Sequence, residues 1–316
     1  MTRVGLPRAL LFHQYGDAWE SFVERLGLEP VVSSTTTGEI LTSGTANTDN
    51  ESCLPVKVFT GHLLKLKEAA DAILIPRVVT QNRGMKSCPK YLGLPDMARA
   101  IDRDLPPIFA PVMDLADRRH KWVNDWYEMA LRFGASQSAA RAAVKAMLAS
   151  LKSCMTPLAG AVTTDAGFEV GVAGHVYNLQ DPRVSMGLLD RIRVMGASPL
   201  VVEQVPRRLI RRELKTLERK IRWDSESDIV GAVLHWSRSR SVAGVIYLSS
   251  FACGPGSMIG ALIEDQFGRE KSVPLMSITL DEHSGEGGLV TRIEAFLDML
   301  RYASADDPSR VPGGAR

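Results

Sequence analysis

Three cysteines occupy the same kind of local setting, which makes them candidates for one shared site. They begin the segments Cys53-Leu-Pro-Val-Lys, Cys88-Pro-Lys-Tyr and Cys253-Gly-Pro-Gly-Ser. Each ends a polar or extended stretch and precedes an apolar run with helical spacing. Three convergent thiolates can hold a metal ion or an iron–sulfur cluster and leave one coordination position open for chemistry or electron transfer. The alternative for each cysteine is a small buried hydrophobic residue.

The sequence around these cysteines suits thiolate chemistry. A helix N-terminus lowers the pKa of a thiol and favours the form that binds metal. Proline fixes the turn after Cys88, and glycine after Cys253 lets the backbone approach a bulky inorganic core. No Cys-x-x-Cys pair occurs, so the spacing of a zinc ribbon or a ferredoxin is absent. The fourth cysteine, Cys154, ends an alanine-rich segment, and we expect it to pack in a core.

Two polar segments add acid–base groups. Asp281–Gly288 follows a predicted strand and contains Glu282, His283 and Glu286, which are candidates for proton transfer, metal binding or hydrogen bonds around a metal site. The alternative is a polar loop that caps the following helix. His175, in Gly-His-Val-Tyr-Asn, follows another predicted strand and is a candidate for the same cleft. Its alternative is a hydrogen-bonded histidine in a tight turn.

A basic segment, Arg207–Arg222, is predicted to be one helix. It could dock an acidic partner or a phosphate-bearing ligand such as coenzyme A, and the alternative is a solvated helix face. The sequence has neither the Gly-x-x-x-x-Gly-Lys-Ser/Thr phosphate loop nor the Gly-x-Gly-x-x-Gly fingerprint. ATP or dinucleotide binding through these motifs is therefore not encoded.

The elements that position these residues alternate between strand-like and helix-like patterns. Strands are predicted at 3–10, 29–33, 71–79, 107–111, 168–172, 199–203, 245–250 and 273–280, with helical spacing between most of them. This order predicts an α/β fold with two Rossmann-like domains, each a doubly wound, mostly parallel sheet, and a cleft between them. In such sheets functional loops lie at the carboxyl ends of the strands, where the cysteines are expected.

The length of 316 residues and the patterning predict a domain division. We expect an N-terminal α/β domain at 1–114, a helical hairpin or linker at 115–166, a C-terminal α/β domain at 167–303 and a flexible tail at 304–316.

The bulk composition narrows the class of protein. The net charge of +2 gives no support for nucleic-acid binding. No apolar run reaches the roughly 18 residues needed to span a bilayer, and no secretory signal pattern opens the sequence. We therefore predict a cytoplasmic protein with reduced thiols and with neither a nucleic-acid nor a membrane partner.

Six motifs follow one another along nearly the whole chain, at Val4–Leu10, Cys53–Lys57, Cys88–Asp96, Gly174–Asn178, Tyr247–Pro255 and Asp281–Met299. Together they resemble the acyl-CoA dehydratase activase-related proteins. That family is similar to the iron–sulfur subunits of 2-hydroxyacyl-CoA dehydratases and to double-cubane cluster proteins. The chain departs from the family at Gly256, where relatives often carry Asp.

The resemblance implies Rossmann-like domains around a cleft. It also implies that Cys53, Cys88 and Cys253 bind a 4Fe–4S cluster or a bridged double cubane. In the dehydratases a separate ATP-hydrolysing activase reduces the cluster by one electron. The electron then passes to a thioester substrate, which becomes a ketyl radical. The partners implied are an ATP-hydrolysing activase or reductase, a second dehydratase-like subunit or a homodimer, and a CoA thioester or other small molecule.

The leading hypothesis is an iron–sulfur protein that acts with an activase in low-potential electron transfer, radical reduction or dehydration. His283, Glu282, Glu286 and His175 are its candidate proton-transfer residues. A second hypothesis is a non-catalytic partner subunit with a structural or regulatory cluster. A third, ranked lower, is a zinc-dependent hydrolase with three cysteines and a water on zinc.

Overall fold

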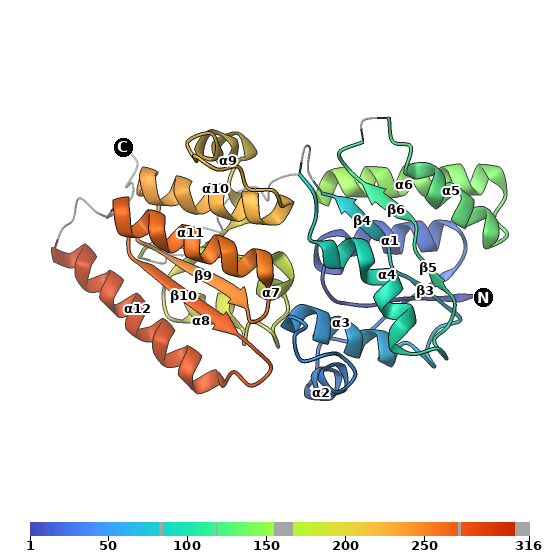
Figure 1. The fold of residues 1–316 in the computed structure, drawn as a ribbon, viewed down its shortest axis with the longest axis horizontal. Coiled ribbons are helices and arrows are strands. Elements are labelled where there is room, and N and C mark those ends of the chain that lie inside the picture. The colour runs from blue at the N-terminus through green and yellow to red at the C-terminus, as the bar shows by residue number, and fades with distance from the viewer. Residues whose placement is uncertain (82–84, 118, 155–166, 271–272, 307–316) are drawn as a thin grey trace. The chain divides into compact units, whose positions relative to one another are not determined.

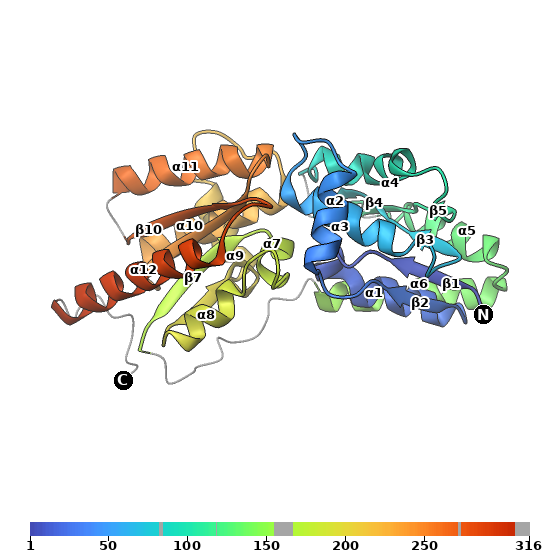
Figure 2. The same cartoon turned by 90° about the horizontal axis from the view of Figure 1, so that it is seen from below.

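The computed structural model describes residues 1–81, 85–117, 119–154, 167–270 and 273–306, and most of its elements are labelled in Figures 1 and 2. The chain divides into two compact units. Unit 1 comprises Met1–Thr156 with Arg222–Asp224, and unit 2 comprises Pro157–Ile221 with Ser225–Arg316. Each unit contains helices and a parallel sheet, so the predicted α/β fold class is confirmed.

The main sheet of unit 1 is parallel, with the strand order β2-β1-β3-β5 in the described residues. Its strands are β1 (Arg3–Leu6), β2 (Glu29–Val32), β3 (Ala72–Leu74) and β5 (Ile108–Phe109). The helices of this unit are α1 (Phe12–Arg25), α2 (Gly38–Ala46), α3 (Leu54–Lys65), α4 (Pro89–Ile101), α5 (Val123–Arg132) and α6 (Gln137–Cys154). Helices α1 and α6 lie side by side in both views (Figures 1 and 2).

The segment predicted as one strand at 71–79 is two strands. After β3, Pro76 precedes β4 (Arg77–Thr80), which pairs with β6 (Val112–Asp114) in a separate parallel ladder. Proline has no N–H to donate to a ladder, so the pairing is interrupted there. Asp224 returns from the far end of the chain and accepts hydrogen bonds from Gln81 N–H (2.7 Å) and Ser87 Oγ (3.2 Å). These bonds anchor both ends of the segment that leads to Cys88.

Unit 2 has a parallel sheet with the order β10-β9-β7-β8 in the described residues. Its strands are β7 (Glu169–Gly174), β8 (Ser198–Val201), β9 (Gly244–Ser250) and β10 (Leu275–Leu280). Its helical elements are α7 (Val176–Gln180), α8 (Leu188–Val194), η1 (Val202–Gln204), α9 (Arg207–Leu214), α10 (Asp224–Ser239, whose first residue belongs to unit 1), α11 (Gly254–Glu270) and α12 (Glu286–Asp306).

Helices cover both faces of this second sheet. The side chains of Val245 and Tyr247 pack with α10 and α11 in one hydrophobic cluster. On the other face, a Cβ at Gly244 would lie 2.8 Å from Leu300 and 3.0 Å from Phe296, both in α12. Figure 2 shows α11 and α12 on opposite sides of β10. The two central strands, β7 and β9, are buried on both faces, which explains their nearly continuous apolar sequences, whereas the edge strands β8 and β10 are largely half-buried.

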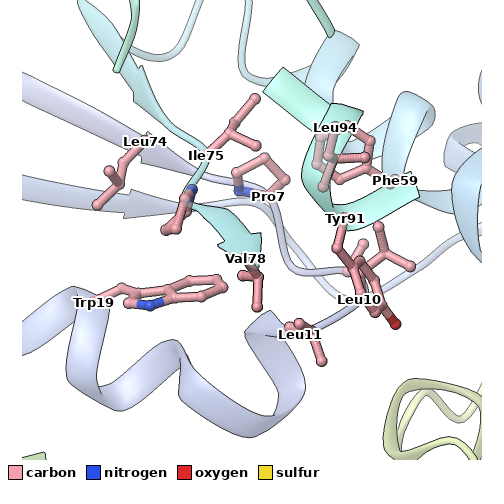
Figure 3. Close-up of a pocket in the computed structure, with 12 residues that line it drawn as sticks. Pro7, Leu10, Leu11, Trp19, Phe59, Leu74, Ile75, Val78, Tyr91 and Leu94 are labelled. Atoms are coloured by element: carbon pink, nitrogen blue, oxygen red, sulfur yellow. The ribbon is translucent and has the colours of Figure 1, made fainter. Parts of the chain in front are cut away.

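The core of unit 1 contains a small apolar cavity, shown in Figure 3. It encloses about 20 Å³ between residues that include Leu10, Trp19, Phe59, Val78 and Tyr91. This volume is enough for roughly one water molecule. The cavity is therefore too small to hold a thioester substrate. In the described part of the chain, no helix is long and apolar enough to cross a membrane.

Candidate functional site

Cys53 is the N-cap residue of α3, with an extended backbone (φ −65°, ψ 150°) and Pro55 in the first turn. The helix runs back toward the start of β3, so its N-terminus lies at the carboxyl edge of the sheet. Its position is fixed by a close crossing with α2. A Cβ at Gly44 would lie 1.9 Å from the carbonyl oxygen of Lys57, and a Cβ at Gly61 would lie 2.0 Å from that of Ile40. The two backbones touch because both contact residues are glycines.

Cys88 is the N-cap residue of α4, and Pro89 follows it in the first turn. Helix α4 precedes β5, so its N-terminus also lies at the carboxyl edge of the sheet. Lys90 donates a hydrogen bond from Nζ to Ser52 Oγ (3.3 Å), which links the start of α4 to the residue before Cys53. The structure therefore brings Cys53 and Cys88 into the same neighbourhood of unit 1.

The Cys53 thiol lies among cations but is itself buried. Burial raises its pKa, while Lys90, the Val56 N–H and Lys57 lower it. Desolvation is therefore the largest influence on the pKa of this thiol, and it opposes the nearby cations and the backbone N–H of the helix start. Lys57 is only 3% exposed. It donates to the backbone carbonyl of Asn50 (3.4 Å), so a cation is held beside a thiol that a metal would deprotonate.

Cys253 lies in unit 2, between β9 and α11, and its side chain is buried. Ala252 before it has a positive φ of 60°, the sharp turn that carries the chain from strand to helix. The Gly256 N–H donates to Cys253 Sγ (3.4 Å). A Cβ at Gly256 would lie 3.0 Å from that sulfur. Glycine at this position thus keeps the space beside the sulfur open.

Tyr247 supports the same turn from within β9. Its hydroxyl donates to the carbonyl of Gly256 (2.7 Å). Burial raises the pKa of the Tyr247 phenol, and the negative charges of Cys253 and Glu226 raise it further. The phenol is therefore a neutral donor at ordinary pH.

The donor set fits a soft metal centre. Thiolates are the preferred ligands of iron–sulfur clusters and of zinc. Cys53 and Cys88 lie together in unit 1, and Cys253 lies in unit 2 with a backbone amide on its sulfur. Within the described residues, no group of three or more Cys, His, Asp or Glu residues forms a metal site. Cys154, at the end of α6, is half-buried, and burial raises the pKa of its thiol.

His175 is the N-cap residue of the short helix α7, directly after β7. Its Nε2 lies 3.0 Å from Glu226 Oε1, and the ring stacks on Tyr177 with centroids 5.0 Å apart. Sequence reasoning found His175 but missed Glu226 in α10 and Glu203 in η1. Local signals for these acids are weak, because the His175–Glu226 contact joins residues 51 positions apart.

The segment 281–286 turns between β10 and α12. Asp281 accepts bonds from Ser284 Oγ (2.7 Å) and His283 N–H (3.0 Å), and these hydrogen bonds, Ser284 first, hold its pKa below the usual range. The side chain of His283 is exposed, and Glu282 is half-buried. Glu286 begins α12 and forms an ion pair with Arg191. The contacts of Asp281 and Ser284 form the turn, and the ion pair of Glu286 joins α12 to Arg191 in α8.

The basic segment forms a shorter helix than predicted. Helix α9 ends at Leu214, where Arg207–Arg222 was expected to be one helix. The side chain of Glu213 is buried and pairs with Arg212 (2.8 Å) and Arg238 (3.0 Å). Like charges three and four residues apart destabilise a helix, and the cations continue beyond Leu214 as Lys215, Arg219 and Lys220.

The fold and the cysteines together define a class of protein. It is an α/β protein with parallel sheets, in which three cysteines directly precede helices. Comparison with known families makes this specific. The CoA enzyme activase uncharacterised domain matches residues 3–205, more than half of the sequence, and the chain belongs to that family. Residues 203–300 match the D-component of 2-hydroxyglutaryl-CoA dehydratase. The chain is therefore an activase-related, dehydratase-like protein.

Two further comparisons add little. No curated protein matches the chain. A solved structure titled "Crystal structure of ZnuA" aligns over 94% of this chain and 98% of that chain, with 12% sequence identity and a TM-score of 0.28. A likeness this low carries no argument about fold or function.

Proposed function

We propose that this chain is an iron–sulfur protein of the 2-hydroxyacyl-CoA dehydratase-like class, with Cys53, Cys88 and Cys253 as the cluster ligands. The observation that carries the proposal is the pairing of two cysteine N-caps in unit 1 through the bond from Lys90 to Ser52. The family matches supply the class of chemistry. When bound, a 4Fe–4S cluster or bridged double cubane would accept and pass on one electron at low potential.

The protein's own residues have definable tasks around such a group. The three thiolates would hold it, and Lys57 and Lys90 would offset part of its negative charge. The Gly256 N–H already donates to the Cys253 sulfur, a contact that orients a ligand and tunes its charge. The backbone of Gly256 leaves the adjacent space free of side chain.

The sequence lacks the common phosphate loop, so ATP use belongs to a partner. We propose an ATP-hydrolysing activase or reductase as that partner. A second dehydratase-like subunit or a second copy of this chain would complete the assembly, with a CoA thioester as the substrate class. Glu282, His283, Glu286 and His175 remain the proposed proton-transfer residues. We expect the protein to act in the cytoplasm, where its thiols stay reduced.

The direct test is the iron and acid-labile sulfide content of protein purified without oxygen. Wild type is expected to carry about four of each per chain for a single 4Fe–4S cluster. Cys53→Ser, Cys88→Ser and Cys253→Ser should each lose them, while the matched control Cys154→Ser should retain them. Iron-free wild type that is folded would refute the cluster. Zinc in its place, lost in the same three variants, would support the hydrolase hypothesis instead.

Reduction of the cluster distinguishes the non-catalytic partner subunit from an electron-transfer protein. A cluster that assembles in wild type but does not change its visible spectrum with a strong low-potential reductant would be structural or regulatory. A cluster that bleaches reversibly by one electron supports electron transfer.

A further inference from the structure

The basic segment continues beyond α9 as a non-helical stretch that is fixed at both ends. Leu217 and Ile221 are partly buried and pack against the hydrophobic cluster of unit 2. The chain then enters unit 1, where the Lys86 N–H donates to the carbonyl of Arg222 (3.2 Å). The Asp224 N–H donates to the carbonyl of Lys86 (3.1 Å). The backbone around Arg222 is therefore held in place.

This backbone pairing places two cations beside the start of α4. Lys86 and Trp223 form an isolated parallel bridge, so Arg222 lies next to the loop that leads to Cys88. Lys86 is two residues before Cys88 in the sequence. The side chains of Lys86 and Arg222 are both exposed, and both residues belong to unit 1. We call these two side chains the cationic face.

Neighbouring acids do not neutralise the cationic face. Neither of its residues forms an ion pair with another residue in the described part of the chain. The cations of α9 differ in this respect, because Arg207 and Arg212 pair with acids. The one acid of α4, Asp96, is itself paired with Arg77 and Arg99. The two charges of the cationic face are therefore available to a partner outside this chain.

The loop before Cys53 has no such excess of positive charge. It contains the acids Asp49 and Glu51. The two cations Lys57 and Lys90 donate hydrogen bonds to the same loop, so the charges there are balanced in number. The start of α4 and the start of α3 therefore differ in the charge that they present.

Cys88 is the most accessible of the three proposed cluster ligands. Its side chain is half-buried, whereas those of Cys53 and Cys253 are buried. A donor protein approaching from solvent comes closest to this ligand set on the side of Cys88. The cationic face lies on that side.

Exposed apolar side chains adjoin the same helix start. Pro89 is exposed, and Leu92, one turn into α4, is 46% exposed. Protein interfaces combine an apolar centre with a polar and charged rim. The start of α4 and the cationic face supply both parts.

We propose that the cationic face is the docking site of a low-potential electron-donor protein that presents an acidic surface around its redox group. The inference rests on the proposed function. The donor loses one electron and the centre held by the cysteines gains it, with no other reactant. Opposite charges steer the donor toward the accessible side of Cys88 and speed the encounter, and salt screens this effect.

The first experiment tests association in the full chain, whether or not a cluster is present. The probe is an oxidised ferredoxin of strongly negative net charge, coupled by a carbodiimide that joins lysine amines directly to carboxylates. Peptide mass spectrometry should find Lys86 coupled about tenfold more often than Lys145, an exposed lysine of α6. High salt should remove the difference. Equal coupling of the two lysines at low salt would overturn the docking site.

The second experiment tests whether the cationic face controls the rate of electron transfer. Lys86→Glu with Arg222→Glu changes the net charge from +2 to −2. The matched control, Arg141→Glu with Lys145→Glu, makes the same change on exposed residues of α6. Stopped-flow mixing of cluster-containing protein with the reduced ferredoxin at low ionic strength should give about a tenfold lower second-order rate for the first variant only. Equal rates in the two variants would show that net charge alone acts, and the proposal would be wrong.

A neutral small-molecule reductant, the deazaflavin radical, separates docking from damage to the cluster. It should reduce wild type and both variants at the same rate, because no charged surface guides it. A slower reaction of the Lys86→Glu and Arg222→Glu variant with this reductant as well would place the effect in the cluster and contradict a docking role.

This inference and the proposed function fail separately. Iron-free protein whose Lys86 still couples selectively would refute the iron–sulfur assignment and support the surface for an acidic partner. A cluster that ferredoxin reduces equally fast in wild type and in the Lys86→Glu and Arg222→Glu variant would refute the docking site alone. If that variant instead loses binding of CoA, measured by calorimetry, the cationic face serves a phosphate-bearing ligand.

Discussion

The residues around the strand-to-helix cysteines differ in charge between the two units. In unit 1, Cys53 begins a helix that contains Lys57, and both Lys57 and Lys90, in the neighbouring helix α4, lower the pKa of its thiol. In unit 2, Cys253 lies near Tyr247, whose phenol also feels Glu226, the partner of His175. The contrast is therefore between a thiol beside two cations in unit 1 and a thiol beside a buried phenol in unit 2. The same strand–loop–helix geometry thus acquires different chemistry from a few residues near each cysteine.

The largest effect is expected from a substitution in the close crossing of α2 and α3, which positions Cys53. Gly44→Ala would place a methyl group 1.9 Å from the Lys57 carbonyl oxygen, so α2 and α3 must separate. We expect a loss of about 3 kcal/mol in the free energy of unfolding, measured by urea denaturation. Cluster content should fall as well, because α3 carries Cys53.

Gly93→Ala is the matched control for this prediction. Gly93 also lies in a helix of unit 1, and a Cβ there would have nothing within 4 Å. Alanine should therefore stabilise α4 by about 0.5–1 kcal/mol. Equal destabilisation by both substitutions would mean that the close helix crossing does not determine the stability of this edge.

A second prediction tests the proposed proton-transfer role of His175 in protein that contains the cluster. If one proton accompanies each electron, the midpoint potential falls by about 59 mV for each unit of rising pH, the value for a tenfold change in a one-electron couple. His175→Gln should flatten this dependence, and Glu226→Gln tests whether the carboxylate that contacts the ring is also needed. A slope that is the same in all three proteins would place the proton elsewhere.

The sequence was a good guide to features set by local chemistry. Proline or glycine after Cys53, Cys88 and Cys253 predicted junctions before helices, and each cysteine directly precedes one. The features it missed depend on contacts between distant residues. The partnership of His175 with Glu226 joins β7 to α10, and the raised pKa of Cys53 comes from burial by the folded chain. Neither leaves a spacing pattern that a single sequence reveals.

The length of α9 shows a different limit. Its sequence has helical spacing to residue 222, but the helix ends at Leu214. Glu213 is buried in ion pairs with Arg212 and Arg238, and Thr216 Oγ1 donates to its carbonyl (2.7 Å). Repulsion among the following cations then favours ending the helix. Periodicity alone does not weigh these terms.

A third prediction concerns Glu203, a half-buried acid in η1. Burial raises the pKa of Glu203 above its ordinary value of 4.5, so the folded chain keeps a proton that the unfolded chain loses. The stability of the wild type therefore falls as pH rises from that ordinary value to the raised one. Glu203→Gln should be more stable than wild type by about 1 kcal/mol at about pH 8, with no difference at about pH 4.

Thermal unfolding across this pH range measures the effect. Glu24→Gln serves as the control, because Glu24 is an exposed acid in α1. A Glu203→Gln curve parallel to that of wild type would contradict the prediction, because it would mean that folding does not raise the pKa of Glu203.

The smallest effect is expected from removing the charge of Lys90 near Cys53 in unit 1. Lys90 lowers the pKa of the Cys53 thiol, so Lys90→Met should leave less thiolate at a given pH. A half-buried cation contributes a fraction of a kcal/mol, which corresponds to about a threefold slower alkylation of Cys53 in iron-free protein. Mass spectrometry of each cysteine after timed iodoacetamide treatment reports this rate. Lys65→Met, on an exposed lysine of α3 paired with Glu39, should leave it unchanged. If both variants react like wild type, the cations do not tune Cys53, and the contrast between the two edges would rest on the acids of unit 2 alone.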